Sequence, residues 1–517
     1  MMRPSKKIVL LLLFLLIVFN SLTPVASAQP VAAEKKWSDW VKSILYSLLS
    51  LSLIIVAFVI FFENRKPSET IAWILAFILS PIFGIILYFL IGRNWRKKKL
   101  FRQKEIVEME HINEIIHTQI EAVRSNEQFC GGWMTNKRRL LQLVLNNTHS
   151  PFTVNNRTEV LTNGRQTYGA ILEEIKKAKH HIHLEFYIVR DDGIGKQIQQ
   201  ALIERAKQGV KVRFMYDGLG SWKLSSQYVE ELKMAGVQVA AFLPVRIPLM
   251  NSKLNYRNHR KIVVIDGSIG FVGGLNIGDE YLGLNEKMGF WRDSHLKIEG
   301  EAVYFLQNIF LEDWGFITGE EVEDLEYFPA QEEVGEELIQ IAASGPDSDW
   351  ESIMQAYFAT IASAQEKVYI TSPYFVPCES ILMALKTAAL SGVDVRIILP
   401  GRPDHRIVYW ASMSYVEDLL RAGVKVYLYE KGFIHAKILM VDSEVASVGT
   451  ANMDMRSFHH NFEVNALIYE HKVVKRLERD FLNDIQDSRE LTLEEFEKRS
   501  IWKKSRESAA RLFSPLL

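Results

Sequence analysis

The sequence predicts an α/β protein in which two duplicated α/β/α halves follow a pair of membrane-spanning helices. Three observations support this fold class. From about residue 148 onward, short apolar segments typical of strands alternate with amphipathic segments typical of helices. The same order of segments then occurs a second time, with closely matching phrases. Before residue 92, two apolar runs have the length that spans a bilayer.

The composition limits the classes of protein that fit. The chain has 517 residues, which corresponds to about two to four domains. Its 61 Lys and Arg residues balance 62 Asp and Glu residues, whereas a protein that binds polyanions usually has a basic excess. We therefore expect no nucleic-acid partner. Cys130 and Cys378 form neither a disulfide framework nor a zinc-binding pattern, so we expect two unpaired thiols.

The first 28 residues form a signal-like apolar segment. A basic start precedes the apolar run 8–19, and Ala26-Ser27-Ala28 follows at the spacing of a cleavage site. This pattern is typical of a signal peptide. A short uncleaved membrane helix is the alternative, although the run is brief for a span.

Residues 41–62 and 71–91 are predicted transmembrane helices. The first carries only Lys42 near its start, and the second carries no charge. Trp73 and Tyr88 lie near the ends of the second run, where interfacial aromatic residues are common. The alternative, a pair of buried core helices, is less favoured because the two runs are adjacent and have polar flanks.

A basic and helical connector is expected over residues 93–147. Its many Lys and Arg residues at 93–104 place it, by the positive-inside rule, in the cytoplasm together with all that follows. The protein would then be a multi-pass protein of the cell membrane with a cytoplasmic catalytic part. A cleaved signal segment would instead invert the hairpin. The larger basic cluster favours the first topology, and it can also hold anionic lipid headgroups.

The two predicted halves cover residues 148–330 and 331–517. The phrases "KQGVKVRFMYDG" and "LSGVDVRIILPG" correspond, as do "YVEELKMAGVQV" and "YVEDLLRAGVKV". Such a long internal repeat indicates duplicated halves rather than a chance likeness of α/β units. In the first half we expect helices over 171–179, 195–208 and 228–235 and strands over 181–188, 210–215 and 237–242. In the second half we expect helices over 357–365, 381–391 and 415–422 and strands over 367–372, 393–398 and 424–429.

Each half continues into the same constellation of polar residues. The first contains "NHRKIVVIDGSIGFVGGLN" and the second "IHAKILMVDSEVASVGTAN". A single His-x-Lys has little value as a signal, but two copies of five positions at identical spacing are specific. The matched residues are His259, Lys261, Asp266, Gly273 and Asn276 in the first half and His435, Lys437, Asp442, Gly449 and Asn452 in the second.

The spacing separates the aspartates from the other motif residues. Lys261 and Lys437 begin strand-like segments, and residues two apart on a strand share a face, so each histidine points with its lysine. Asp266 lies an odd number of residues from His259 and begins a turn, as Asp442 does in the second copy. This parity favours a structural role for both aspartates and leaves a chemical role as the alternative.

Two such His/Lys pairs facing each other can transfer a phosphodiester group. One imidazole can attack phosphorus to form a phosphohistidine, while the other protonates the leaving alkoxide and later deprotonates the incoming hydroxyl. The lysines can neutralise the non-bridging oxygens, and Asn276 and Asn452 can add amide donors. The lysines make a metal unnecessary, and we expect no metal site and no cofactor. The alternative for each histidine alone is a satisfied core residue.

Two carboxylates are candidates to orient the imidazoles. Asp293 follows the first motif in "FWRDSHLKI", and Glu463 follows the second in "NFEVNALIY". A carboxylate at one ring nitrogen holds an imidazole for use of the other. The alternative is that each is an ordinary surface or salt-bridged acid.

The two HxKxxxxD motifs with a trailing Gly-x-x-Asn resemble the phospholipase D superfamily. Within it, the second motif region and the hairpin "RKPSETIAWILAFILSPIFGIILYFLIGRN" are similar to the bacterial cardiolipin synthases. The resemblance implies two phospholipase-D-like halves forming one catalytic unit. It implies transfer of a phosphatidyl group between two phosphatidylglycerol molecules, giving cardiolipin and glycerol, with phosphatidylglycerol and bilayer lipids as partners. It also implies six active-site residues: His259, Lys261, Asp266, His435, Lys437 and Asp442.

Three other functions fit parts of the sequence. A phospholipase D-type hydrolase would use the same covalent chemistry with water as acceptor. A membrane-anchored nuclease is disfavoured by the near-zero net charge. A non-catalytic membrane scaffold is disfavoured because histidine and lysine are intact in both copies.

Overall fold

The structure is a computed structural model of the chain. It describes residues 137–244 and 255–517, apart from 149, 287, 321, 323, 324 and 349, together with scattered positions between 40 and 119. The chain divides into two compact units, residues 1–92 and residues 93–517. The signal-like segment 1–28 lies outside the described residues.

The first unit is described only at residues 40–44, 46–48, 50, 51, 54, 73, 75 and 77, all of them helical. Within the part of the chain that is described, no helix combines the length and the apolar character needed to cross a bilayer. Most of segments 41–62 and 71–91 falls outside that part, so the two spans stay a prediction.

The first half of the second unit is built on a seven-stranded mixed sheet. Its strands are β1 (Asn156–Thr162), β2 (His181–Phe186), β3 (Lys211–Asp217), β4 (Gln238–Phe242), β6 (Ile262–Ile265), β7 (Ile269–Gly273) and β9 (Ser294–Gly300). Their order is β1-β9-β7-β6-β2-β3-β4. β2, β3 and β4 are parallel, as expected for strands joined by crossover helices, and the others are antiparallel to their neighbours.

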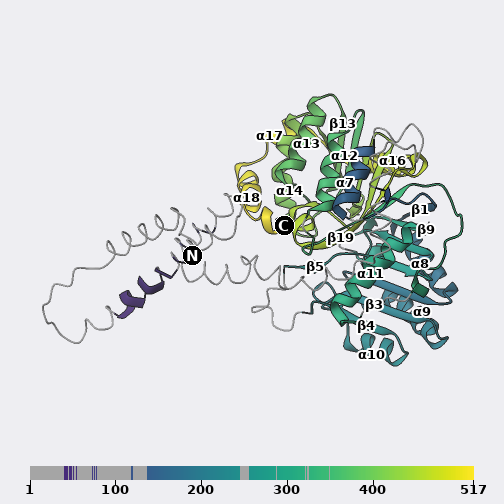
Figure 1. The fold of residues 1–517 in the computed structure, drawn as a ribbon. Coiled ribbons are helices and arrows are strands. Elements are labelled where there is room, and N and C mark those ends of the chain that lie inside the picture. The colour runs from purple at the N-terminus through teal and green to yellow at the C-terminus, as the bar shows by residue number, and fades with distance from the viewer. Residues whose placement is uncertain are drawn as a thin grey trace, which may run out of the picture. The chain divides into compact units, whose positions relative to one another are not determined.

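The second half repeats this sheet. Its strands are β10 (Ile339–Ser344), β11 (Lys367–Thr371), β13 (Asp394–Pro400), β14 (Lys425–Tyr429), β16 (Ile438–Val441), β17 (Val445–Gly449), β19 (Asn461–Ile468) and β20 (Ser488–Leu491). The order β10-β19-β17-β16-β11-β13-β14 matches the first sheet strand for strand, and β20 adds one edge. The predicted duplication is therefore confirmed, and in Figure 1 the two halves form two neighbouring lobes.

Helices cover both faces of each sheet. On the outer faces lie α8 (Asn163–Lys177), α9 (Gly193–Lys207) and α10 (Ser226–Met234) in the first half, and α7 (Arg138–Thr148), α12 (Ser352–Ala362), α13 (Glu379–Leu390) and α14 (Arg406–Arg421) in the second. On the inner faces lie α11 (Ala302–Thr318) and α16 (His471–Gln486). The remaining helices near the C-terminus are α15 (Met455–His459), α17 (Leu493–Glu497) and α18 (Ile501–Arg511).

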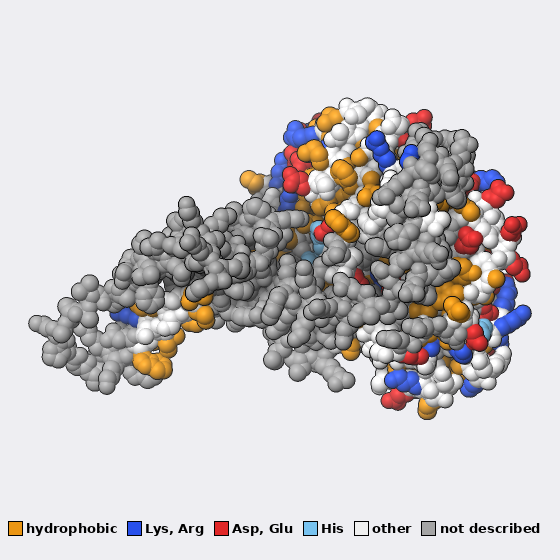
Figure 2. Space-filling model, in the orientation of Figure 1, with side chains coloured by type: hydrophobic (Ala, Val, Ile, Leu, Met, Phe, Trp, Pro, Cys, Tyr) orange, Lys and Arg blue, Asp and Glu red, His pale blue; other side chains and the backbone are white. Residues whose placement is uncertain are grey.

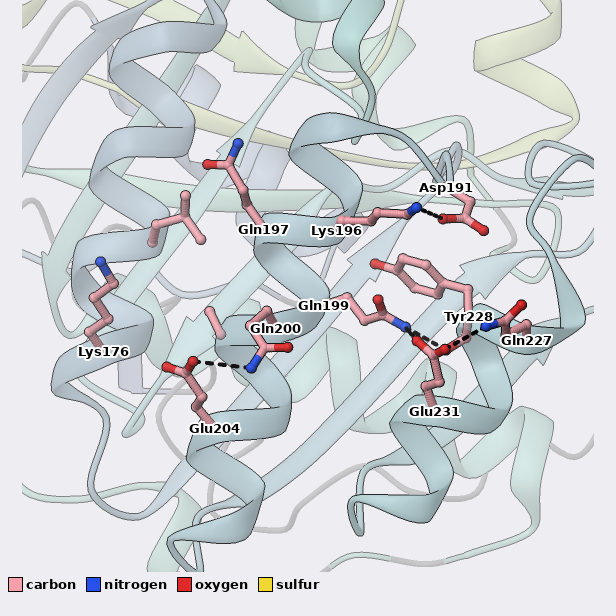
Figure 3. Close-up of a pocket in the computed structure, with 12 residues that line it drawn as sticks. Lys176, Asp191, Lys196, Gln197, Gln199, Gln200, Glu204, Gln227, Tyr228 and Glu231 are labelled. Atoms are coloured by element: carbon pink, nitrogen blue, oxygen red, sulfur yellow. Dashed lines mark hydrogen bonds and ion pairs between the residues drawn. The ribbon is translucent and has the colours of Figure 1, made fainter.

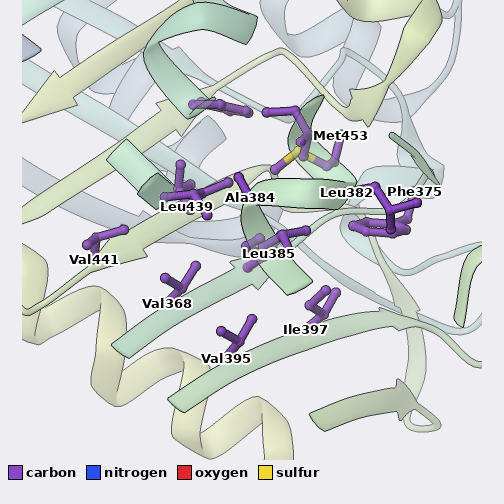
Figure 4. Close-up of a cluster of buried hydrophobic side chains, with 14 of the residues drawn as sticks. Val368, Phe375, Leu382, Ala384, Leu385, Val395, Ile397, Leu439, Val441 and Met453 are labelled. Atoms are coloured by element: carbon purple, nitrogen blue, oxygen red, sulfur yellow. The ribbon is translucent and has the colours of Figure 1, made fainter. Parts of the chain in front are cut away.

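The core explains why the central strands are apolar without alternation. Figure 4 shows Leu385 of α13 packing over strand residues such as Val368 and Ile397 in the outer core of the second half. The next residue, Ile398, points to the other face and joins an inner cluster that contains residues of both sheets, α11 and α16. Because both faces are covered, both sets of side chains must be apolar. The shared inner cluster makes the two halves one compact body.

The element boundaries differ from the predicted ones mainly at helix starts. α8 begins at Asn163 rather than at 171, because its first turn is polar, and α14 begins at Arg406 rather than at 415. α7, at the end of the predicted connector, belongs to the second half, where Asn147 donates to Gln355 at 3.0 Å and packs beside α12.

Candidate active site

Each His/Lys pair lies in an extended segment between a short strand and a main strand. The short strands are β5 (Arg257–Asn258) and β15 (Gly432–Ile434). The main strands β6 and β16 begin one residue after the lysines, not at them as predicted. Residues two apart in extended backbone still share a side. The ammonium of Lys261 donates to the carbonyl of His259 at 2.6 Å, and that of Lys437 to the carbonyl of His435 at 2.5 Å.

The short strands cross to the opposite half. β5 pairs in parallel with the start of β19, and β15 pairs in parallel with β8 (Phe290–Arg292). The backbone N–H of His259 donates to the carbonyl of Phe462 at 2.9 Å, and that of His435 to the carbonyl of Arg292 at 2.7 Å. Figure 1 shows β5 and β19 where the two lobes meet. Each half thus holds the histidine of the other.

The two candidate carboxylates are crossed in the same way. His259 Nδ1 lies 3.0 and 2.9 Å from the two carboxylate oxygens of Glu463, in the second half. His435 Nδ1 lies 2.7 Å from Oδ2 of Asp293, in the first half. A carboxylate only accepts, so Nδ1 carries the proton in both rings. The lone pair of each imidazole is therefore on Nε2, the nitrogen turned away from the carboxylate.

The charges of these groups follow from burial. Burial, reinforced by Lys437 and Lys261, lowers the pKa of His435 to about 4 despite Asp293. Burial likewise lowers the pKa of His259 to about 4. Burial alone would raise the pKa of Glu463, but His259 and Lys261 outweigh it and lower that pKa to about 2. Both imidazoles are therefore neutral at pH 7, and Glu463 is ionised.

The two lysines are buried beside the histidines. Burial lowers the pKa of Lys437 to about 8, while Asp293 and Glu463 oppose that shift. Burial and the Lys437 charge also hold the pKa of Lys261 well below its usual range. Because the charges of one pair act on the pKa values of the other, the four basic side chains form a single site.

Asp266 and Asp442, which the family resemblance implies as active-site residues, bind backbone N–H groups at the starts of two strands. The Asp266 carboxylate accepts the backbone N–H groups of residues 179, 180 and 181, at 2.8 to 3.0 Å. The Asp442 carboxylate accepts those of residues 365, 366 and 367, at 2.8 to 2.9 Å. Both aspartates have left-handed backbone, with φ of 51° and 54°. They fasten the β6–β7 and β16–β17 turns to the strand starts, as the parity of the spacing predicts.

The two motif asparagines have different surroundings. The Asn276 amide accepts the Ile188 N–H at 3.1 Å and donates to the Tyr281 hydroxyl at 3.2 Å, so it holds the loops of its own half. The side-chain oxygen of Asn452 is buried and, among the described residues, has no hydrogen-bond partner. Asn276 thus uses both ends of its amide group, whereas the amide oxygen of Asn452 is uncommitted.

Aromatic residues that we did not single out flank the imidazoles. Tyr187 meets the His259 ring edge-on, with centroids 5.0 Å apart, and Trp291 lies 5.2 Å from the His435 ring. Tyr187 directly follows β2 and Trp291 lies within β8. In the sequence, only the position of Tyr187 just after a predicted strand and that of Trp291 just before Asp293 could have pointed to these two residues. These rings reduce the access of water to both histidines.

The hydrogen bonds that hold the orienting carboxylates were also not predicted from the sequence, and they differ between the two halves. Thr450 and Asn461 donate to Glu463 at 2.6 and 3.0 Å. Behind His259, the buried Arg260 pairs with Asp313 and donates to the Glu463 carbonyl at 3.2 Å. At the position matching Arg260 the second half has an alanine. Neither feature repeats between the motifs, so the repeat did not reveal them.

Features elsewhere in the described part of the chain lie apart from the two motifs. No cluster of three or more His, Cys, Asp or Glu side chains there could hold a metal ion. A groove of about 700 Å³ lies between α8, α9 and α10 and is lined by side chains such as Gln199, Tyr228 and Glu231 (Figure 3). It contains no residue of either motif.

Comparisons with known proteins agree with this geometry. The family described as "Cardiolipin synthase, PLD-like domain" matches residues 171–314 and 357–485, and the family "Phospholipase_D-nuclease N-terminal" matches residues 51–93. The chain is 49% identical to a cardiolipin synthase of Geobacillus kaustophilus, covering 93% of this chain and 95% of the relative. It is 47% identical to a cardiolipin synthase of Halalkalibacterium halodurans, covering 98% and 99%. It is 44% identical to the major cardiolipin synthase of Bacillus subtilis, covering 92% and 100%.

A solved structure shows the same fold. The chain resembles a phosphatidylserine synthase from Haemophilus influenzae with a TM-score of 0.56, covering 73% of this chain and all of that one. The sequence identity is 17%, so this likeness concerns the fold alone.

Proposed function

The chain belongs to the cardiolipin synthase family of the phospholipase D superfamily, and from this membership we propose its reaction. It transfers a phosphatidyl group between two phosphatidylglycerol molecules and gives cardiolipin and glycerol. The observation that carries the proposed mechanism is the pair of neutral imidazoles, each fixed through Nδ1 by a carboxylate of the opposite half. This leaves two Nε2 atoms and two ammonium groups for one phosphodiester.

The first step forms a phosphohistidine. Nε2 of one histidine attacks phosphorus, the N–P bond forms, and the bond from phosphorus to the headgroup glycerol breaks. The other imidazole, as imidazolium, gives its proton to the departing glycerol oxygen. The anionic phosphate favours protonation of this imidazole when it enters the site. Lys261 and Lys437 neutralise the non-bridging oxygens.

The second step runs in the opposite direction with a new acceptor. The terminal hydroxyl of a second phosphatidylglycerol gives its proton to the neutral imidazole and attacks phosphorus. The N–P bond breaks and cardiolipin leaves. Water would give phosphatidic acid instead, so transfer requires a site from which water is largely excluded. Tyr187 and Trp291 beside nearly buried histidines support that exclusion.

Membrane attachment fits a substrate that lies in a bilayer. We propose that segments 41–62 and 71–91 span the cell membrane and that the catalytic unit faces the cytoplasm. The apolar composition of both segments and the basic residues at 93–104 support this topology. Protease added to intact cells should spare the catalytic unit, and its digestion would invert the topology.

The reaction is tested with purified protein in mixed micelles of phosphatidylglycerol. We expect one glycerol released for each cardiolipin formed. Phosphatidic acid as the only product would identify a hydrolase, and salt-sensitive cleavage of DNA would favour a nuclease. His259→Ala and His435→Ala should each lower the rate by about 10⁴-fold. Trapping the phosphohistidine on wild-type protein would identify the nucleophile.

A further inference from the structure

The C-terminal helix α18 presents large apolar side chains to the outside. Trp502 is 78% exposed and Ile501 76%, and the residues that follow the helix, Leu512 and Phe513, are 80% and 53% exposed. Four large apolar side chains within 13 residues of one surface element cost free energy in water. A surface of this kind is typical of an interaction site.

The other side of α18 is firmly attached to the catalytic unit. Ala510 and Glu507 are buried against it. The Arg506 guanidinium lies 5.4 Å from the Trp410 ring of α14, and the Arg511 guanidinium lies 4.3 Å from the ring of Tyr415. The exposed apolar residues therefore belong to a helix whose opposite face already packs against the catalytic unit.

The outward side is also basic. Lys503, which directly follows Trp502, is exposed, and the next residue, Lys504, is partly exposed. The single acidic residue of α18, Glu507, is buried and paired with Arg499, so it does not offset them. Figure 2 shows hydrophobic and basic side chains, with acidic ones among them, over this part of the molecule. Apolar and aromatic residues interleaved with lysine match the interface of an anionic bilayer, where rings enter the headgroup layer and ammonium groups meet phosphates.

The chain end connects this surface to the candidate active site. The Leu517 carbonyl accepts the N–H of Arg456 in α15 at 2.8 Å, and the Tyr415 hydroxyl donates to Ser514 at 2.9 Å. α15 occupies the stretch between Asn452 and Glu463, the two site residues of the second motif region. A surface that rests on α18 is thus fastened to the backbone beside the site.

We propose that α18 and the tail after it, residues 501–517, dock the catalytic unit onto an anionic phospholipid bilayer. The proposal rests on the function proposed above, because it states how the site reaches a lipid substrate. Docking holds the site at the headgroup layer, so that phosphatidylglycerol enters without crossing water.

Depth-dependent quenching tests the docking directly. In full-length protein with Cys130→Ser and Cys378→Ser, a fluorescent probe is attached at Trp502→Cys or Phe513→Cys and the protein is reconstituted in phosphatidylglycerol vesicles. The control is Met234→Cys, an 81% exposed apolar position at the end of α10. We expect lipid-borne spin labels to quench the probes at 502 and 513, and iodide to quench the control. Iodide quenching at 502 and 513 would overturn the proposal, as would protection from both quenchers, which would indicate a protein partner.

Kinetics separate docking from chemistry. A variant with Trp502→Gln, Lys503→Gln, Lys504→Gln and Phe513→Gln is compared with Leu390→Gln, a 74% exposed control. We expect the surface concentration of phosphatidylglycerol at half-maximal rate to rise about tenfold in vesicles, with less than twofold change on short-chain monomeric substrate. Equal loss on both substrates, or no loss in vesicles, would overturn the proposal. Wild-type protein that makes no cardiolipin from either substrate would refute the proposed function, while quenching still tests docking.

Discussion

The two halves of the candidate active site carry the same motif, but the carboxylates that hold the two histidines have different hydrogen-bond partners. His259 contacts both oxygens of Glu463, which also accepts hydrogen bonds from Thr450 and Asn461. His435 contacts one oxygen of Asp293, whose other oxygen accepts the Ser294 N–H. Both arrangements leave a neutral imidazole with a free Nε2. The chemistry therefore requires a histidine, a lysine and a carboxylate in each half, while the groups around the carboxylate differ between the halves.

The largest expected effect comes from neutralising the carboxylates. Glu463→Gln and Asp293→Asn should each lower kcat by about 10³- to 10⁴-fold, because the imidazole loses its fixed tautomer and its stabilising anion. The loss should be greater for Glu463→Gln, since the new amide also conflicts with the donors Thr450 and Asn461. Rates on short-chain phosphatidylglycerol measure the effect.

The same pair of variants tests whether the difference between the two carboxylates matters for function. Equal rates together with equal unfolding temperatures would show that the extra hydrogen bonds of Glu463 have no functional weight. Thr450→Val provides the matched control, because it removes one donor and keeps the carboxylate. It should cost less than Glu463→Gln.

The next largest effect concerns the ion pair that only the first half has. Arg260→Ala removes the positive charge that pairs with the buried Asp313, and we expect the free energy of unfolding to fall by about 3–5 kcal/mol. Thermal or denaturant unfolding measures the loss. The double variant Arg260→Met with Asp313→Leu should recover much of it, because it removes both charges. If the double variant does not regain stability, the hydrogen bonds or packing of the Arg260–Asp313 pair, and not only the balance of its charges, stabilise the fold.

The features that occur in both halves were easier to predict from the sequence than those that occur in only one half. The strands are continuous apolar runs, and the motif spacing put histidine and lysine on one side, so both were predictable. Asp293 and Glu463 were found as candidates, but their crossed assignment was not, because His259 and Glu463 are 204 positions apart. Tyr187 and Arg260 have no counterpart in the other motif, and their contacts exist only after the halves pack.

The turn aspartates should affect stability and leave the chemistry intact. Asp266→Ala and Asp442→Ala each release three backbone N–H groups, and we expect losses of about 2 kcal/mol in the free energy of unfolding. The rate per folded molecule should stay within a few-fold of wild type. A loss of about 10³-fold at unchanged stability would instead assign both aspartates a part in the chemistry.

The smallest effect is a pH dependence that distinguishes the two lysines. The pKa of Lys437 is lowered to about 8, so its positive charge is complete below that pH and is lost as the pH rises through it. We expect log(kcat/KM) to fall above about pH 8 by up to tenfold for each pH unit. The histidine that attacks phosphorus must be neutral, and its pKa of about 4 places the acid limb near pH 4. Lys437→Arg should remove the alkaline limb, and its persistence would assign that limb to Lys261.

The crossing of β5 to β19 also has a consequence during synthesis of the protein. A nascent chain contains His259 long before Glu463, which follows 204 positions later, has been made. At about 5–20 residues per second, the ribosome needs roughly 10–40 s to add that stretch. Throughout this interval the first histidine lacks both its carboxylate and the strand that holds its backbone. The first histidine therefore cannot be oriented for chemistry until translation has passed Glu463.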